Sequence, residues 1–180
     1  MRTDPFTVEI IGEMLRASAE EMFVTLGRTA QSPIIYEVLD MACGLVTAEG
    51  ELIAEAAGVP GFIGCLSFAA KDISEKFGPA ALRPGDVYAT NDPYRGGGTH
   101  LSDVVLVAPI FFRGDLVGFA VDKAHWTEVG GMAAGSWTTD AREIYQEGLQ
   151  LPAVKLYDGG EPVGSLIDLI AANVRLPDST

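Results

Sequence analysis

Two histidines and one aspartate are the residues of this chain that could hold a metal ion. His100 and His125 are its only histidines, and Asp103 follows His100 three residues later, where an apolar run begins. Imidazole nitrogens and carboxylate oxygens are common ligands of divalent metals, and three protein ligands leave room for water or substrate. The sequence therefore contains the parts of an open metal centre, provided that the fold brings them together.

Two apolar runs between these residues predict a β-hairpin. Residues 103–112 and 116–123 flank the turn sequence at 113–115. With a three-residue loop, Asp103 falls opposite His125 and His100 falls opposite Glu128, and residues directly opposite each other share a face of the hairpin. A two-residue turn would shift the register by one and move the two groups to opposite faces. Two interpretations stay open: a metal centre, or two histidines that are hydrogen-bonded residues of loops.

The segment after the second run adds a carboxylate and two indoles. Glu128 lies three residues beyond His125 and could be a fourth ligand, an orienting partner of a histidine, or a general base. A solvated loop carboxylate is the alternative. Trp126 and Trp137 could line an apolar substrate pocket, but most tryptophans simply pack.

A glycine-rich loop at 91–99 leads directly into His100. Gly97 and Gly98 allow close backbone approach and positive φ, and the amides of this loop could bind an anion beside Arg95. Asp92 is a further polar candidate. No Gly-Lys-Ser/Thr follows, so the loop is not a P-loop. A tight turn that only positions His100 is the alternative.

The elements that must carry these residues do not alternate regularly between helix and strand. This order favours an α+β fold, with a mixed or antiparallel sheet, a long N-terminal helix and flanking helices. No linker or repeat divides residues 1–180, so we expect a single domain. The expected elements are helices at 3–30, 62–77 and 163–174 and strands at 34–39, 44–47, 51–54, 87–89, 103–112, 116–123 and 153–157.

Composition excludes some classes of partner. The 180 residues include 12 basic and 25 acidic side chains, a net charge of −13, which gives no electrostatic footprint for nucleic acid or an anionic membrane. The longest apolar stretch, 104–112, is too short to span a bilayer. Cys43 and Cys65 are solitary in apolar context, so we expect buried free thiols and a cytoplasmic protein.

Several motifs occur in order along most of the chain, and together they resemble the hydantoinase B family over about residues 6 to 176. Family members are longer than this chain, so the resemblance implies that 1–180 is the N-terminal part of a longer subunit. The motifs are Asn91-Asp92-Pro93-Tyr94, Gly96-Gly97-Gly98-Thr99-His100-Leu101-Ser102-Asp103, Ala124-His125-Trp126-Thr127-Glu128-Val129-Gly130-Gly131, Gly135-Ser136 and Glu147-Gly148-Leu149 with Pro152.

The resemblance implies cofactors and partners. The family contains B subunits of ATP-dependent hydantoinases, 5-oxoprolinases and related lactamases, and subunits of acetone and acetophenone carboxylases. The resemblance implies a divalent metal (manganese, zinc or iron) held by His100, Asp103 and His125. It also implies a hetero-oligomer with a hydantoinase A-type subunit, which binds ATP with magnesium and phosphorylates the small-molecule substrate.

The implied activity is hydrolysis of a cyclic amide. A metal-bound water would attack the phosphorylated substrate, with Glu128 as a proton acceptor. We expect Asp92, Arg95, Gly97, Gly98 and Trp126 to contact the substrate. The alternatives are a subunit of an ATP-dependent ketone carboxylase and a non-catalytic assembly subunit. The chain departs from the family pattern in having Glu at 128, often Asp, and no histidine within 60–64.

Overall fold

The computed structural model describes residues 4–180 and begins with a long helix, α1 (Pro5–Thr29). Asp4 caps it by accepting a hydrogen bond from the Thr7 amide at 3.3 Å, and Pro5 fits the first turn because it has no amide proton to leave unpaired. The expected helix at 3–30 is thus confirmed to within a residue, apart from residue 3, which lies outside the described part. Among the described residues, no helix is both long and apolar enough to cross a bilayer.

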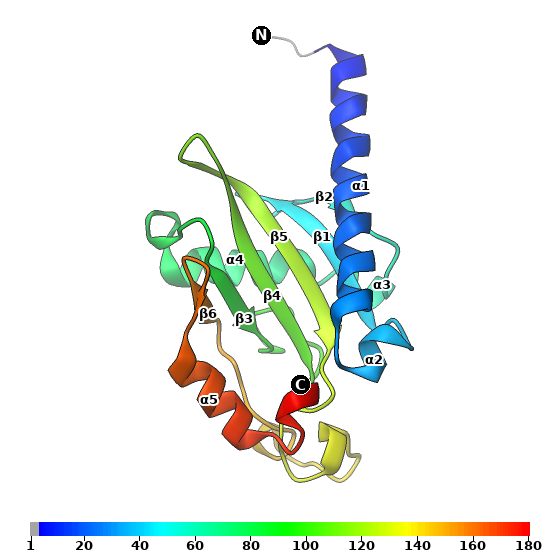
Figure 1. The fold of residues 1–180 in the computed structure, drawn as a ribbon, viewed down its shortest axis with the longest axis vertical. Coiled ribbons are helices and arrows are strands. Elements are labelled where there is room, and N and C mark those ends of the chain that lie inside the picture. The colour runs from blue at the N-terminus through cyan, green and yellow to red at the C-terminus, as the bar shows by residue number, and fades with distance from the viewer. Residues whose placement is uncertain (1–3) are drawn as a thin grey trace.

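The sheet has seven strands in the order β2-β1-β5-β4-β3-β6-β7, and every neighbouring pair is antiparallel (Figure 1). The α+β fold class is therefore confirmed. The strands are β1 (Met41–Thr47), β2 (Leu52–Glu55), β3 (Val87–Thr90), β4 (Asp103–Phe112), β5 (Asp115–His125), β6 (Val154–Asp158) and β7 (Glu161–Pro162).

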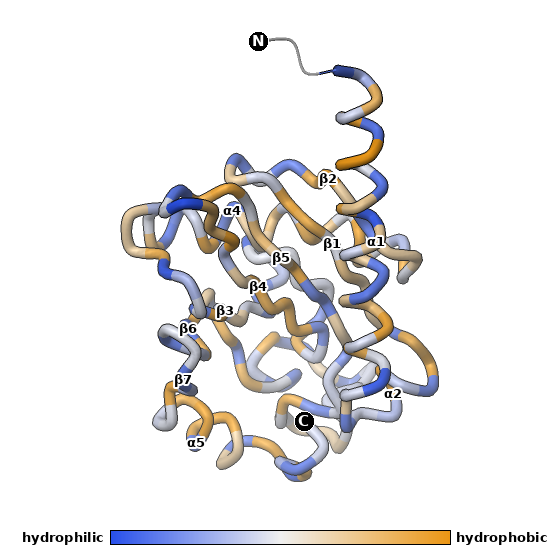
Figure 2. The backbone as a smooth tube through the Cα atoms, turned by 45° about the horizontal axis from the view of Figure 1, so that its top comes forward, coloured by the Kyte–Doolittle hydropathy of each residue, from blue (hydrophilic) through white to orange (hydrophobic). Residues whose placement is uncertain are grey.

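Helices cover both faces of this sheet (Figure 1). Helix α4 (Leu66–Phe77) packs on one face, against inward side chains such as Val105 and Val107. On the other face, α1 packs over β1 and β2, while α5 (Gly164–Asn173) closes the cluster that contains Val104. Apolar colour in Figure 2 follows the central strands, because both faces of these strands are buried against helices along part of their length.

The β4–β5 hairpin differs from the expected one at its tip and agrees with it at its base. Its turn has two residues, Arg113 and Gly114, both with positive φ (53° and 93°), as a type I′ turn requires. A β-bulge follows, because Ile110 pairs with Gly118 whereas the next residue pairs with Leu116. The extra residue restores the register, and Asp103 pairs with His125.

The expected strand at 34–39 is wrong. Residues 33–36 form the short helix α2 (Pro33–Tyr36), and the amides of Ile35 and Tyr36 donate to the carbonyl oxygen of Ser32. Pro33 has φ preset for a first helical turn, and a short apolar run has no periodicity that separates strand from helix. Ile35 still reaches the core beside Met41.

A smaller difference concerns the helix after β2. The expected helix at 62–77 is two helices, α3 (Pro60–Ile63) and α4, which meet at Gly64 and Cys65. The last described residues form a 3₁₀ turn, η4 (Pro177–Ser179). Further 3₁₀ turns are η1 (Pro79–Ala81), η2 (Ala134–Ser136) and η3 (Ile144–Gln146).

Candidate metal centre

The base of the β4–β5 hairpin gathers three potential ligands. Asp103 begins β4, His125 ends β5 directly opposite, and His100 lies in the loop that enters β4. One ligand atom from each residue lies within 4.8 Å of the other two, and the imidazole centroids are 4.9 Å apart. Among residues 4–180, these are the His, Cys, Asp or Glu side chains that converge in this way.

A backbone contact determines which nitrogen of His125 is free to bind a metal. His125 is 6% exposed, and its Nδ1 lies 2.7 Å from the carbonyl oxygen of Trp126. A carbonyl oxygen can only accept, so Nδ1 carries the proton and donates it. In the neutral imidazole, Nε2 then keeps its lone pair. A histidine that binds a metal through Nε2 needs this tautomer.

The two oxygens of Asp103 have different surroundings, although the residue is only 1% exposed. Oδ2 accepts a hydrogen bond from the Thr99 hydroxyl and lies 3.9 Å from Lys123 Nζ. Oδ1 lies 3.2 Å from His100 Nε2, yet among the described residues no donor makes a hydrogen bond to it. A buried carboxylate oxygen without a donor is costly, and a cation there would satisfy it.

These residues fit a divalent metal. Bonds of about 2.0–2.1 Å at tetrahedral angles place two neighbouring donors about 3.3 Å apart, close to the observed spacing of His100 Nε2 and Asp103 Oδ1. Two imidazoles and one carboxylate form a donor set that suits zinc, iron and manganese, so the set alone does not choose among them.

The glycine loop forms a tight turn. The amides of Gly96 and Gly98 both donate to the carbonyl oxygen of Asp92 at 3.1 Å, so they are engaged within the loop rather than directed at an anion. Gly97 has φ +73°, and a Cβ there would lie 2.5 Å from the carbonyl oxygen of Cys65. The glycines therefore let the loop pack directly on the backbone before α4, which fixes the approach to His100.

The charged members of this loop face α4. Arg95 forms an ion pair with Asp72 at 3.6 Å. Burial raises the pKa of Asp72, and the Arg95 charge opposes part of that rise. Asp92 accepts a hydrogen bond from the Tyr94 amide and, with Arg95 and Lys76, lines a surface hollow of about 450 Å³.

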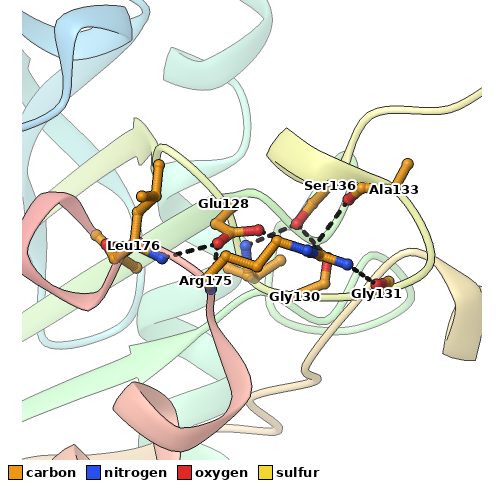
Figure 3. Close-up of polar contacts among 9 residues, drawn as sticks. Glu128, Gly130, Gly131, Ala133, Ser136, Arg175 and Leu176 are labelled. Carbon is orange, nitrogen blue, oxygen red and sulfur yellow. Dashed lines mark hydrogen bonds and ion pairs between the residues drawn. The ribbon is translucent and has the colours of Figure 1, made fainter.

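Glu128 does not lie opposite His100 as expected, because the pairing of β4 with β5 begins only at Asp103. Glu128 is instead buried in a separate network (Figure 3). Its Oε1 accepts hydrogen bonds from the amides of Arg175 and Leu176, and its Oε2 accepts one from Arg175 Nη1 at 2.9 Å. Arg175 also donates to the carbonyl oxygens of Gly131 and Ala133. The pairing of Glu128 therefore ties the end of the chain to the loop after β5.

The two tryptophans have different roles in the structure. Trp126 is partly buried and packs with α5 in the cluster around Val174. Trp137 is 69% exposed, and its ring meets the His100 ring edge-on at a centroid distance of 5.2 Å. Trp137 is therefore the indole that contacts the candidate ligands.

Sequence reasoning missed three residues of these networks. Thr99 and Lys123 contact Asp103, and Arg175 pairs with Glu128. Lys123 could have been found, since it lies two residues before His125 and alternation places both on one face of the strand. Arg175 is separated from its partner by 47 residues, and no local pattern joins them.

Comparisons with known proteins agree in family. A family model described as Hydantoinase B/oxoprolinase matches residues 4–180. An uncharacterized protein of Methanocaldococcus jannaschii is 40% identical over 98% of this chain and 32% of its own length. Caprolactamase subunit beta of Pseudomonas jessenii is 34% identical over 96% of this chain and 29% of its own length. The chain thus spans about a third of the length of these relatives.

Two solved structures share the fold. The nucleotide-free structure of acetone carboxylase superposes with a TM-score of 0.88 at 22% identity, over 96% of this chain and 23% of that chain. The ATP-dependent caprolactamase of P. jessenii superposes with a TM-score of 0.83 at 29% identity, over 97% of this chain and 30% of that one.

Proposed function

This chain belongs to the hydantoinase B/oxoprolinase family, and from that premise we propose that it is the metal-binding part of an ATP-dependent amide-ring hydrolase. The observation that carries the proposal is the convergence of His100, Asp103 and His125, with a buried carboxylate oxygen left open. The similarity to a caprolactamase subunit beta supports the reaction class. In this proposal residues 1–180 are one domain, corresponding to the N-terminal part of a longer B-type subunit.

The residues of the centre have separate tasks. His125 is held by the Trp126 carbonyl through Nδ1, which leaves Nε2 as its ligand nitrogen, and Asp103 directs Oδ1 toward His100. A divalent metal bound there (manganese, zinc or iron) would supply a Lewis acid and lower the pKa of a coordinated water. The Trp137 ring contacts the His100 ring at a centroid distance of 5.2 Å.

Activation of the amide is assigned to a partner. Amide resonance makes a lactam carbonyl a poor electrophile, and phosphorylation of its oxygen removes that resonance. We assign the phosphorylation to an ATP-binding, A-type subunit in a hetero-oligomer. The name of the similar caprolactamase subunit beta and the ATP dependence of that enzyme support this division.

The substrate contacts expected of Asp92, Arg95, Gly97, Gly98 and Trp126, and proton acceptance by Glu128, stay predictions. The hydrogen bonds of Glu128 to Arg175 and Leu176 favour a structural role for this residue. A ketone carboxylase subunit is the second candidate, and the shared fold with acetone carboxylase makes it worth testing.

Turnover by the complex with its ATP-binding subunit tests the proposal. We expect ATP-dependent opening of a cyclic amide without bicarbonate, loss of turnover in Asp103→Asn, and full turnover in Asp115→Asn. Asp115 is the matched control because it is an exposed aspartate at the other end of the same hairpin. A strict requirement for bicarbonate with a ketone substrate would support the carboxylase instead. Full turnover by folded Asp103→Asn would leave only a role in assembly.

A further inference from the structure

A completely buried lysine lies beside the candidate metal centre. Lys123 is 0% exposed, on β5 two residues before His125, and it pairs with Val105 of β4 and Ala42 of β1. A buried ammonium group loses its hydration, so such a side chain is kept only where other groups replace the lost water. The groups that take the place of this water therefore indicate the role of Lys123.

The partners of the ammonium group come from segments far apart in the sequence. Lys123 Nζ donates to the carbonyl oxygen of Gly97 at 2.8 Å and to the Thr99 hydroxyl at 3.2 Å. It lies 4.5 Å from the centroid of the Phe62 ring of α3, a cation–π distance, and 3.9 Å from Asp103 Oδ2. One ammonium group therefore joins the glycine loop, α3 and the start of β4.

These contacts hold the loop that leads to His100. Gly97 and Thr99 are the third and first residues before His100, so their bonds to Lys123 hold the loop that carries this histidine. Because the Thr99 oxygen accepts from Lys123, its proton is directed to Asp103 Oδ2. Oδ2 is thereby occupied, and Oδ1 is the oxygen left to bind an ion.

We propose that Lys123 is a positioning residue of the metal centre, which fixes the His100 loop through Gly97 and, through Thr99, selects the oxygen of Asp103 that binds the ion. This inference rests on the proposed function. It assigns to Lys123 no contact with the metal or the substrate. A lysine that only stabilised the core would affect folding and leave the geometry of the ligands unchanged.

The test uses Co²⁺, whose visible spectrum reports the geometry of its ligands, on the purified protein. Lys123→Met removes the ammonium group and keeps an apolar stem, while Thr99→Val removes only the hydroxyl. We expect each variant to bind Co²⁺ about 10–100-fold more weakly, the usual effect of losing a group that orients a ligand, with a changed spectrum. In metal-free Lys123→Met, the amides at 97–100 should exchange hydrogen faster.

Lys155→Met is the matched control. Lys155 also lies on the sheet and is paired with carboxylates, Asp86 and Asp158, but it touches none of the three candidate ligands. The Lys155→Met substitution should lower the free energy of unfolding and leave the Co²⁺ affinity and the Co²⁺ spectrum as in the wild type.

Three outcomes separate this inference from the proposed function. If the wild type binds no Co²⁺, both fail. If the wild type binds Co²⁺, loses it in Asp103→Asn, and Lys123→Met binds with unchanged affinity and spectrum, only the positioning role is overturned. If Lys123→Met does not fold, Thr99→Val decides, and unchanged affinity and spectrum in that variant overturn the inference.

Discussion

Two buried carboxylates lie near the base of the β4–β5 hairpin, Asp103 at the start of β4 and Glu128 three residues after the end of β5. They differ in how many of their oxygens accept hydrogen bonds. Asp103 and Glu128 are each 1% exposed, and each has a cation beside it. Both oxygens of Glu128 accept hydrogen bonds, from Arg175 and Leu176. Asp103 uses Oδ2 in the same way, but Oδ1 has no donor among the described residues.

The difference shows which observation indicates a ligand. Burial and a nearby cation are common to both carboxylates, so neither property identifies a metal site. An oxygen with unused acceptor capacity, next to two imidazoles of which one, His125, has its Nδ1 proton bound by the backbone, does indicate one. A fully bonded carboxylate has its acceptors occupied and stabilises the fold instead. Substitutions at the two kinds of carboxylate should therefore differ in their effect on metal affinity.

The largest effect is expected for His125→Ala. Loss of the imidazole removes one of three ligands, so metal affinity should fall by at least about 100-fold, more than the loss of an orienting group costs. Isothermal titration of the metal-free protein with Zn²⁺ or Mn²⁺ measures it. Tight binding by a folded His125→Ala protein would show that the ion is held elsewhere.

Glu128→Gln should affect stability and not metal binding. The change removes the charge that Arg175 and Leu176 pair with, and hydrogen bonds to charged groups contribute about 1.5–3 kcal/mol each, here reduced because Arg175 is partly exposed. We expect the free energy of unfolding in urea to fall by about 1–3 kcal/mol. A fall in metal affinity as large as that of His125→Ala would make Glu128 a ligand and remove the distinction.

Asp122 provides a test of whether a carboxylate oxygen without a donor is enough, without neighbouring histidines, to form a metal site. Its Oδ1 also has no donor in the described structure, but it faces the α1 side of the sheet, among Met22, Thr25 and Leu26, away from the histidines. Burial raises the pKa of Asp122 above its ordinary value of 3.8, and Cys43 opposes this only in part. The folded protein should therefore be more stable when the Asp122 carboxyl is protonated than when it is charged.

Asp122→Asn therefore has an effect that depends on pH. In the wild type, the favourable contribution is complete below pH 3.8 and is lost as pH rises through the raised pKa of the folded state. The amide variant should be more stable than the wild type at neutral pH, and the advantage should vanish below pH 3.8, in denaturant unfolding at both pH values. Its metal affinity should be unchanged. An equal advantage at both pH values would contradict the assigned titration.

The smallest effect is expected for Trp137→Ala. The indole meets His100 edge-on and is largely exposed, and such aromatic contacts contribute about 0.5–1.5 kcal/mol at most. Metal affinity should fall less than about 10-fold, the free-energy equivalent of that contact. Trp126→Ala is the comparison, since its indole packs against α5 and its loss should lower stability with no change in affinity.

The candidate ligands could be predicted from the sequence because their geometry is local to one hairpin. The expected register was correct at Asp103 and His125, but for an incomplete reason, since a two-residue turn and a bulge together replace the expected three-residue loop. A bulge depends on packing and twist rather than on a residue type. The network of Glu128 was not predictable, because Arg175 comes from the far end of the chain.

The assignment of Asp103 as a ligand and of Glu128 as a structural residue is tested directly by metal content. Asp103→Asn and Glu128→Gln proteins are purified side by side with the wild type and shown to be folded. We expect about one divalent ion per chain in the wild type and in Glu128→Gln, and none in Asp103→Asn, because a site of this kind binds a single ion through its three ligands. Retention of the metal by Asp103→Asn, or its loss from folded Glu128→Gln, would contradict the assignment of the two carboxylates.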